Sequence, residues 1–305
     1  MKNVRFFLGI SIILCSLSLF VTSCDNEETP AAKDVVDVAL ADSRFSTLTK
    51  LLTDNGLVST LKGAGPFTVF APTNEAFAKI DASKLTQAEL VNVLKSHVVG
   101  AKVLAADVKS GSANSLGSAI YLSKNSTGVF VNGNSRVTTA DVPASNGVIH
   151  IIDNVIVPPT RNLVQIAQGD ANFSELVSLV LAADASVLTA LSTASANGLT
   201  VFAPTNAAFT ELYKTTPKAT LLNPANKTLL TNVLLYHVVP GRVFSSDLPN
   251  VTGEVSTANA AAKLSFDLTS GAKVKGKTSG NSNITNVNIL ATNGVIHVID
   301  KVLLP

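Results

Sequence analysis

The sequence contains no Trp, only one Met and two Cys, and its charged and aromatic residues make up 14% and 5% of the chain. The 23 Lys and Arg nearly balance the 21 Asp and Glu, so the net charge of +2 creates no field that would gather nucleic acid or anionic lipid. Surfaces that stack on sugars would have to come from a few Tyr and Phe. We therefore expect no nucleic-acid partner.

The two cysteines both lie at the N-terminus, within or next to a segment typical of exported proteins. Lys2 and Arg5 are followed by an apolar run over residues 6–20 and by the letters "VTSC". The run is shorter than the roughly 20 residues that a membrane span needs. We expect residues 1–23 to be a signal peptide, which leaves Cys24 as the one thiol of the mature chain and excludes an internal disulfide.

The letters around Cys24 resemble a bacterial lipoprotein signal, in which the cysteine sulfur is acylated and the peptide is cut before it. Val21 stands where that pattern usually has Leu. Several acyl chains give a durable anchor, and an uncleaved signal anchor is the alternative. Residues 24–33 then form an acidic tether similar to those of surface-exported lipoproteins in Bacteroidetes-type bacteria, whereas Asp25 resembles an inner-membrane retention signal in enterobacteria. We expect a lipid-anchored protein of the bacterial envelope, at the surface of the outer membrane, with no other contact with the membrane.

A long internal repeat dominates the remaining sequence. The heptapeptide "TVFAPTN" occurs at residues 68–74 and again at 200–206, and "NGVIHIIDNVIVP" at 146–158 returns as "NGVIHVIDKVLLP" at 293–305. A repeat of this length predicts two copies of one domain, each with its own core, rather than a solenoid. We place the domains at 34–158 and 160–305, separated at Pro158 and Pro159.

Each copy begins with helical periodicity and ends with strands. Asp34 and Ser43 are candidate N-caps, and Thr86 to Glu89 forms a capping box. In the heptapeptides a short apolar strand ends at a proline, after which the helix cap is expected at one of two polar residues: Thr73 or Asn74 in the first copy, Thr205 or Asn206 in the second. Strands are predicted over 101–108, 119–123, 128–134, 136–142 and 147–157. This order predicts an α+β fold with helices packed on a largely antiparallel sheet.

The heptapeptide, the "HVV" at the end of a helix, and the closing "NGVIHIIDNVIVP" together resemble the fasciclin (FAS1) domain in both copies. The resemblance implies two FAS1-like domains, each a compact β-sheet wedge with helices packed against it. It also implies an extracellular or membrane-anchored protein that mediates adhesion through proteins or glycans.

The four histidines occupy equivalent positions in the two copies, two in each: His97, His150, His237 and His297. No helix carries a histidine pair at i and i+4, and no cysteine is available for a metal site or a nucleophile. His97 and His237 lie on apolar helical stripes, and the other two lie within apolar strands. We interpret all four as structural and expect no enzyme activity, metal or cofactor.

Possible binding residues come only from the family resemblance. Animal fasciclin domains use a Tyr-His pair in integrin binding, which Tyr236 and His237 match, whereas the first copy has Ser96 before His97. An Asp-Ile motif of the family corresponds to Asp141 and Val142 in the first copy and to Asn288 and Ile289 in the second. Neither copy has both motifs complete.

A lysine strip at 272–277, "AKVKGK", is either a solvated hairpin face or a contact strip for acidic glycans. Our leading hypothesis for the whole chain is a non-catalytic, lipid-anchored surface adhesion or binding module that recognises an extracellular protein or glycan. The alternative is a carrier of an apolar small molecule such as a carotenoid, and a hydrolase comes third.

Overall fold

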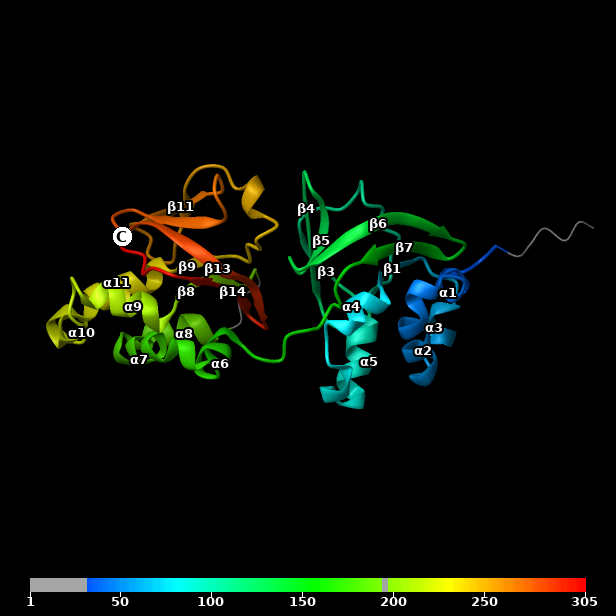
Figure 1. The fold of residues 1–305 in the computed structure, drawn as a ribbon, viewed down its shortest axis with the longest axis horizontal. Coiled ribbons are helices and arrows are strands. Elements are labelled where there is room, and N and C mark those ends of the chain that lie inside the picture. Colours follow the sequence, from blue (N-terminus) through cyan, green and yellow to red (C-terminus); the bar gives the residue numbers. More distant parts are fainter. Residues whose placement is uncertain (1–31, 194–196) are drawn as a thin grey trace, which may run out of the picture. The chain divides into compact units, whose positions relative to one another are not determined.

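A computed structural model describes residues 32–193 and 197–305, and Figure 1 shows their helices and strands. Residues 33–305 form one unit. The signal peptide, Cys24 and nearly all of the tether predicted from the sequence lie outside the described residues. Among the described residues, no helix has both the length and the apolar character needed to cross a membrane.

The first domain places its helices before most of its strands. The helices are α1 (Val35–Leu40), α2 (Ser46–Asp54), α3 (Val58–Leu61), α4 (Asn74–Ala78) and α5 (Gln87–Ser96). The strands are β1 (Phe67–Pro72), β2 (Val98–Val99), β3 (Gly111–Ala113), β4 (Ile120–Asn125), β5 (Gly128–Val131), β6 (Ser135–Ala144) and β7 (Gly147–Ile152). Two 3₁₀ turns, Ser43–Phe45 and Ala82–Lys84, join the helices.

The second domain repeats this order. Its helices are α6 (Leu163–Gln168), α7 (Ser174–Ala182), α8 (Ala185–Ser192), α9 (Asn206–Tyr213), α10 (Lys218–Leu221) and α11 (Lys227–Tyr236). Its strands are β8 (Leu199–Pro204), β9 (Val238–Pro240), β10 (Val255–Ser256), β11 (Lys263–Asp267), β12 (Lys273–Gly276), β13 (Gly280–Ala291) and β14 (Gly294–Ile299). Three 3₁₀ turns cover Ala171–Phe173, Pro224–Asn226 and Leu248–Asn250.

Each domain contains one seven-stranded sheet, in the order β2-β1-β7-β6-β5-β4-β3 and β10-β11-β12-β13-β14-β8-β9. Among the strand pairs of the described residues, only β1 with β7 and β8 with β14 are parallel. Each sheet is therefore largely antiparallel, and the predicted α+β fold is confirmed. All six residues of β7 and of β14 are buried, because helices cover one face of these strands and the curled outer strands cover the other.

The helix starts follow from capping. Asp34 caps α1, and Thr86 and Glu89 form the expected capping box at α5. Ser43 is not an N-cap as predicted, because Asp42 accepts the Arg44 N–H at the start of that turn.

The strand predicted over 101–108 is wrong. This segment forms turns and coil, because side chains, and not a neighbouring strand, hydrogen-bond its backbone N–H and C=O groups. The Thr68 hydroxyl donates to Ala101 O (2.6 Å) and accepts from Val103 N (2.8 Å).

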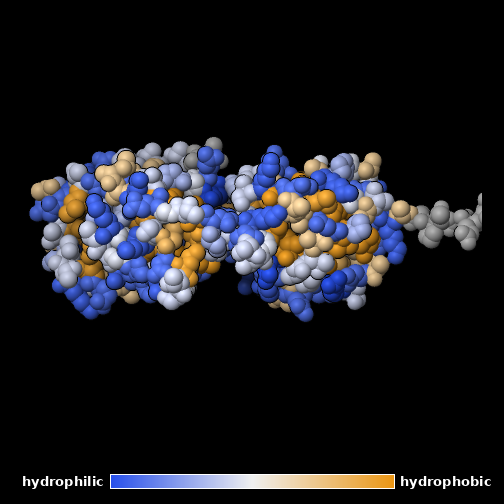
Figure 2. Space-filling model, turned by 90° about the horizontal axis from the view of Figure 1, so that it is seen from above, coloured by the Kyte–Doolittle hydropathy of each residue, from blue (hydrophilic) through white to orange (hydrophobic). Residues whose placement is uncertain are grey.

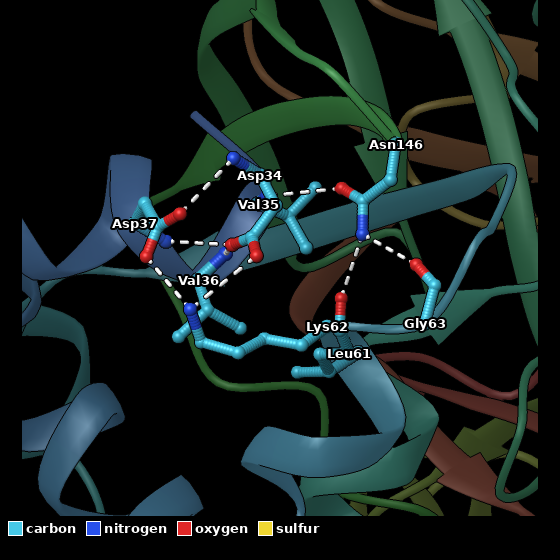
Figure 3. Close-up of polar contacts among 8 residues, drawn as sticks. All are labelled: Asp34, Val35, Val36, Asp37, Leu61, Lys62, Gly63 and Asn146. Atoms are coloured by element: carbon cyan, nitrogen blue, oxygen red, sulfur yellow. Dashed lines mark hydrogen bonds and ion pairs between the residues drawn. The ribbon is translucent and has the colours of Figure 1, made fainter. Parts of the chain in front are cut away.

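A single amide in the β6–β7 turn ties the first helices to the sheet (Figure 3). Asn146 accepts from Val35 N at 3.0 Å and donates to the carbonyls of Leu61 and Gly63, both at 2.8 Å. Lys62 forms ion pairs with Asp34 and Asp37 beside it. Asn293 does the same in the second domain, where it accepts from Leu163 N and donates to Leu191 O and Thr193 O. The "NG" of the closing motif therefore fixes the position of α1 and α6.

Candidate functional site

The polar letters of the heptapeptide all hold the fold together. Thr73 and Thr205 accept from the N–H groups of Ala76 and Ala208, and so cap α4 and α9. Asn74 bonds both Thr47 N and Ser43 O, and Asn206 bonds Glu175 N and Ala171 O in the same way. Each asparagine thus joins two helix starts that lie about 30 residues apart in the sequence.

Thr68 and Thr200, the first residues of the two heptapeptides, have a structural role that was not predicted from the sequence. Thr68 and Thr200 are fully buried, and each hydroxyl bridges two backbone groups of the segment that follows β2 or β9. The signal was present in the sequence, since a hydroxyl inside an apolar strand needs a partner.

His97 and His237 close the ends of α5 and α11 from inside the core, with 1% and 3% of their surface exposed. The Nε2 of His97 accepts from Ile156 N at 2.9 Å, so the proton lies on Nδ1 and is donated to Val93 O at 2.7 Å. His237 repeats this arrangement with Leu303 N (2.9 Å) and Val233 O (2.8 Å). Burial lowers the pKa of both rings to about 4, so both are neutral at pH 7.

His150 and His297 carry the opposite tautomer. Each Nδ1 accepts a backbone N–H, from Asp141 (3.2 Å) and Asn288 (3.4 Å) respectively. Each Nε2–H then donates to a carbonyl, of Val103 (2.9 Å) and Val243 (2.8 Å). These rings join the bulged strand β6 or β13 to the segment after β2 or β9, and burial lowers the pKa of His297.

The first residues of the Asp-Ile motif, Asp141 and Asn288, also connect β6 or β13 to the segment after β2 or β9. Asp141 and Asn288 have φ values of +58° and +59°, which their short polar side chains tolerate. Asp141 accepts from Ala105 N at 2.9 Å, and Asn288 accepts from Ser245 N at 2.8 Å. Asp141 is exposed, Val142 packs half-buried against the core, and Asn288 is buried.

Tyr236 is fully buried and connects α11 to the sheet through its hydroxyl. Its hydroxyl donates to Lys263 O at 2.7 Å and accepts from Lys277 N at 2.9 Å. Burial raises the pKa of Tyr236, and the ring is therefore neutral at physiological pH. Tyr236 and His237 are thus both inside the protein, and of the six residues at positions of the family motifs only Asp141 is exposed.

The two domains meet through the outer face of β4 and the turn after β5. Arg242 lies with its guanidinium carbon 4.4 Å from the ring centre of Tyr121 and donates to the Tyr121 hydroxyl at 2.6 Å. The hydroxyls of Ser123 and Ser246 share a buried hydrogen bond of 2.6 Å. At Gly133, with φ +70°, a Cβ would lie 2.7 Å from Phe244, so the contact requires glycine.

Each domain also contains an apolar cavity between its first three helices and the strand β1 or β8. In the first domain the cavity has about 180 Å³ and is lined by residues that include Val36, Leu48, Leu52 and Val69. In the second it has about 50 Å³, and Leu176 and Val201 are among its lining residues.

The geometry defines a tandem pair of one α+β domain, in which the imidazoles and the asparagine amides that recur in both copies bond backbone groups inside each domain. Over residues 32–193 and 197–305, no three His, Cys, Asp or Glu residues group so as to hold a metal. A model of the fasciclin domain matches residues 43–158 and 171–305, so the chain belongs to the fasciclin family.

Similar proteins occur in animals and bacteria. Transforming growth factor-beta-induced protein ig-h3 of Oryctolagus cuniculus is 33% identical over 85% of this chain, and Homo sapiens periostin is 31% identical over 90%. This chain spans only 38% and 31% of their lengths. The Synechocystis protein sll1735 is 41% identical over 40% of this chain and 96% of its own, so a single domain of this kind occurs as a nearly entire protein.

Among solved structures, the chain is similar to a FAS1 domain pair from the insect cell adhesion molecule fasciclin I. It covers 86% of this chain and 97% of its own, at 17% identity and a TM-score of 0.45.

Proposed function

We propose that this protein is a non-catalytic adhesion or binding module, held by a lipid on Cys24 at the outside of a bacterial cell, that recognises an extracellular protein or glycan. The observation that carries the proposal is the use of all four imidazoles. Each ring bonds backbone groups through both nitrogens, which leaves none of them to act as a general base or a ligand.

The functional surface then consists of exposed polar side chains, which surround scattered hydrophobic residues on the face drawn in Figure 2. Surfaces of this kind bind weakly one at a time. Two linked domains raise the effective concentration of the second contact, which favours a tandem module in adhesion.

The test is adhesion of cells that carry the full chain to host cells or neighbouring bacteria, compared with a deletion strain. Because the two contacts act together, we expect removal of either domain to lower adhesion by more than half. Protease treatment of intact cells should degrade the protein, and Cys24→Ala should release it from the membrane fraction. Equal adhesion by the deletion strain would overturn the proposal.

The paired cavities favour a carrier of a small apolar molecule as the second candidate. A cavity of about 150 Å³ binds benzene, so the one in the first domain accepts a small apolar molecule, whereas the one in the second has room for little more than a water or two. A carotenoid would require the helices to separate. Protein purified from its own host should then yield an apolar compound on solvent extraction, and an extract without one would contradict this function.

A further inference from the structure

The outer face of β11 and β12 in the second domain gathers lysines. Lys263, Lys275 and Lys277 are exposed, whereas Leu264, Val274 and Gly276 between them are buried. Alternate residues of a strand point to opposite faces, so the three ammonium groups stand on the same side. Lys273 lies opposite Asp267 in the pairing of β11 with β12, further along the same face.

This face forms the floor of a groove of about 380 Å³. Its other lining residues include Glu254, Ser265 and the segment from Ala260 to Ala262. Three lysines against one carboxylate leave the groove positive. Within the described part of the chain, none of these three lysines takes part in an ion pair, so their charges are available to a ligand.

The equivalent face of the first domain is already a docking surface. Leu122 and Ser123 correspond to Leu264 and Ser265, and this alignment places Tyr121, Phe130 and Asn132 where the second domain has its three lysines. Tyr121 and Ser123 are covered by Arg242 and Ser246 of the second domain. The fold thus uses this face for a contact between domains, and in the second domain the same face is exposed and basic among the described residues.

A second copy of the chain is a poor occupant of the groove. The segment that would dock, if the internal contact were repeated, is residues 102–109 of the first domain, which correspond to 242–249. It carries Lys102 and Lys109 against the single Asp107, so two positive surfaces would meet. Charge complementarity requires an acidic occupant.

We infer that the groove over β11 and β12 binds an acidic polysaccharide, whose carboxylate or sulfate groups pair with Lys263, Lys275 and Lys277. The inference rests on the proposed adhesion function and names the class of its ligand. No aromatic ring lines the groove, so bases of a single-stranded nucleic acid have nothing to stack on, whereas Ser265 and the lysine ammonium groups can bond sugar hydroxyls and acids.

The experiment measures retention of the full chain on immobilised heparin, which is sulfated, on polygalacturonate, which is carboxylated, and on neutral dextran. We expect salt-dependent retention on one or both acidic polymers and none on dextran. The variant Lys263→Gln/Lys275→Gln/Lys277→Gln should bind about tenfold more weakly, as expected for the loss of three exposed ion pairs. Tyr236 bonds only the backbone of Lys263 and Lys277, so the fold is preserved.

The matched control is Lys95→Gln/Lys102→Gln/Lys109→Gln, which removes the same charge from exposed sites of the first domain. Its affinity should equal that of the unchanged chain. Equal losses in both variants would show a mere net-charge effect and overturn the inference, as would stronger binding to poly-glutamate or to single-stranded DNA than to either polysaccharide.

Adhesion of cells separates this inference from the proposed function. If cells with the groove variant adhere as well as cells with the unchanged chain, the groove inference fails and the adhesion function stands. If the unchanged chain binds the polysaccharide but confers no adhesion, the function fails and the groove assignment stands.

Discussion

Replacing His237 with alanine should lower the free energy of unfolding of the second domain by about 3–5 kcal/mol, because it leaves a buried donor and a buried acceptor without partners and opens a cavity. The orphaned groups are Leu303 N and Val233 O. The backbone offers no replacement, since the N–H of residue 237 already donates to Leu234 O. Urea unfolding followed by hydrogen exchange measures the loss in each domain.

The equivalent variant, His97→Ala, serves as the matched test in the first domain. It should leave Ile156 N and Val93 O without hydrogen-bond partners, and so lower the free energy of unfolding of the first domain by the same amount. Each variant should act chiefly on its own domain, because each ring bonds only groups of that domain. A loss below about 1 kcal/mol would mean that water or a backbone shift replaces the ring, and that these histidines are not braces.

The sequence predicts those elements whose cause is local. The pair Thr86 and Glu89 acts within one helix turn, so its spacing alone reveals the capping box. The caps of α4 and α9 are also local, but the sequence narrowed them only to Thr73 or Asn74 and Thr205 or Asn206, and the structure assigns the threonines. The inward position of His97 and His237 follows from helical periodicity. The same apolar spacing occurs in both copies of the repeat, which strengthens the prediction.

Long-range contacts explain what the sequence could not predict. Residues 101–108 have an apolar pattern that suits a strand, but Thr68, Asp141 and His150 take up their backbone groups from up to 47 positions away. The contact between Tyr121 and Arg242 spans 121 positions, and only the folded chain brings them together. The lysines of 272–277 likewise gain Lys263 as a neighbour only through the pairing of β11 with β12.

Mild acid should destabilise both domains at pH values above those at which most of their carboxylates titrate. The rings of His97 and His237 have a pKa of about 4 when folded, against an ordinary value of 6.5. At pH 7.5 and above the rings are almost entirely neutral in both states, and the full stability is present. As the pH falls from about 7 to about 4, each imidazole binds a proton in the unfolded chain but stays neutral in the folded chain. The free energy of unfolding therefore decreases over this range.

The loss in this window should approach about 3 kcal/mol in each domain, since one pKa unit corresponds to about 1.4 kcal/mol. A protonated Nε2 would direct its own N–H at the N–H of Ile156 or Leu303, and the hydrogen bond between them would be lost. This explains why protonation of the ring is unfavourable in the folded state. Urea midpoints measured between about pH 7.5 and 4.5 test this, because Asp and Glu titrate mostly below that range. A midpoint that stays constant from pH 7 to 5 would show that the rings are solvated and that the buried braces do not exist in solution.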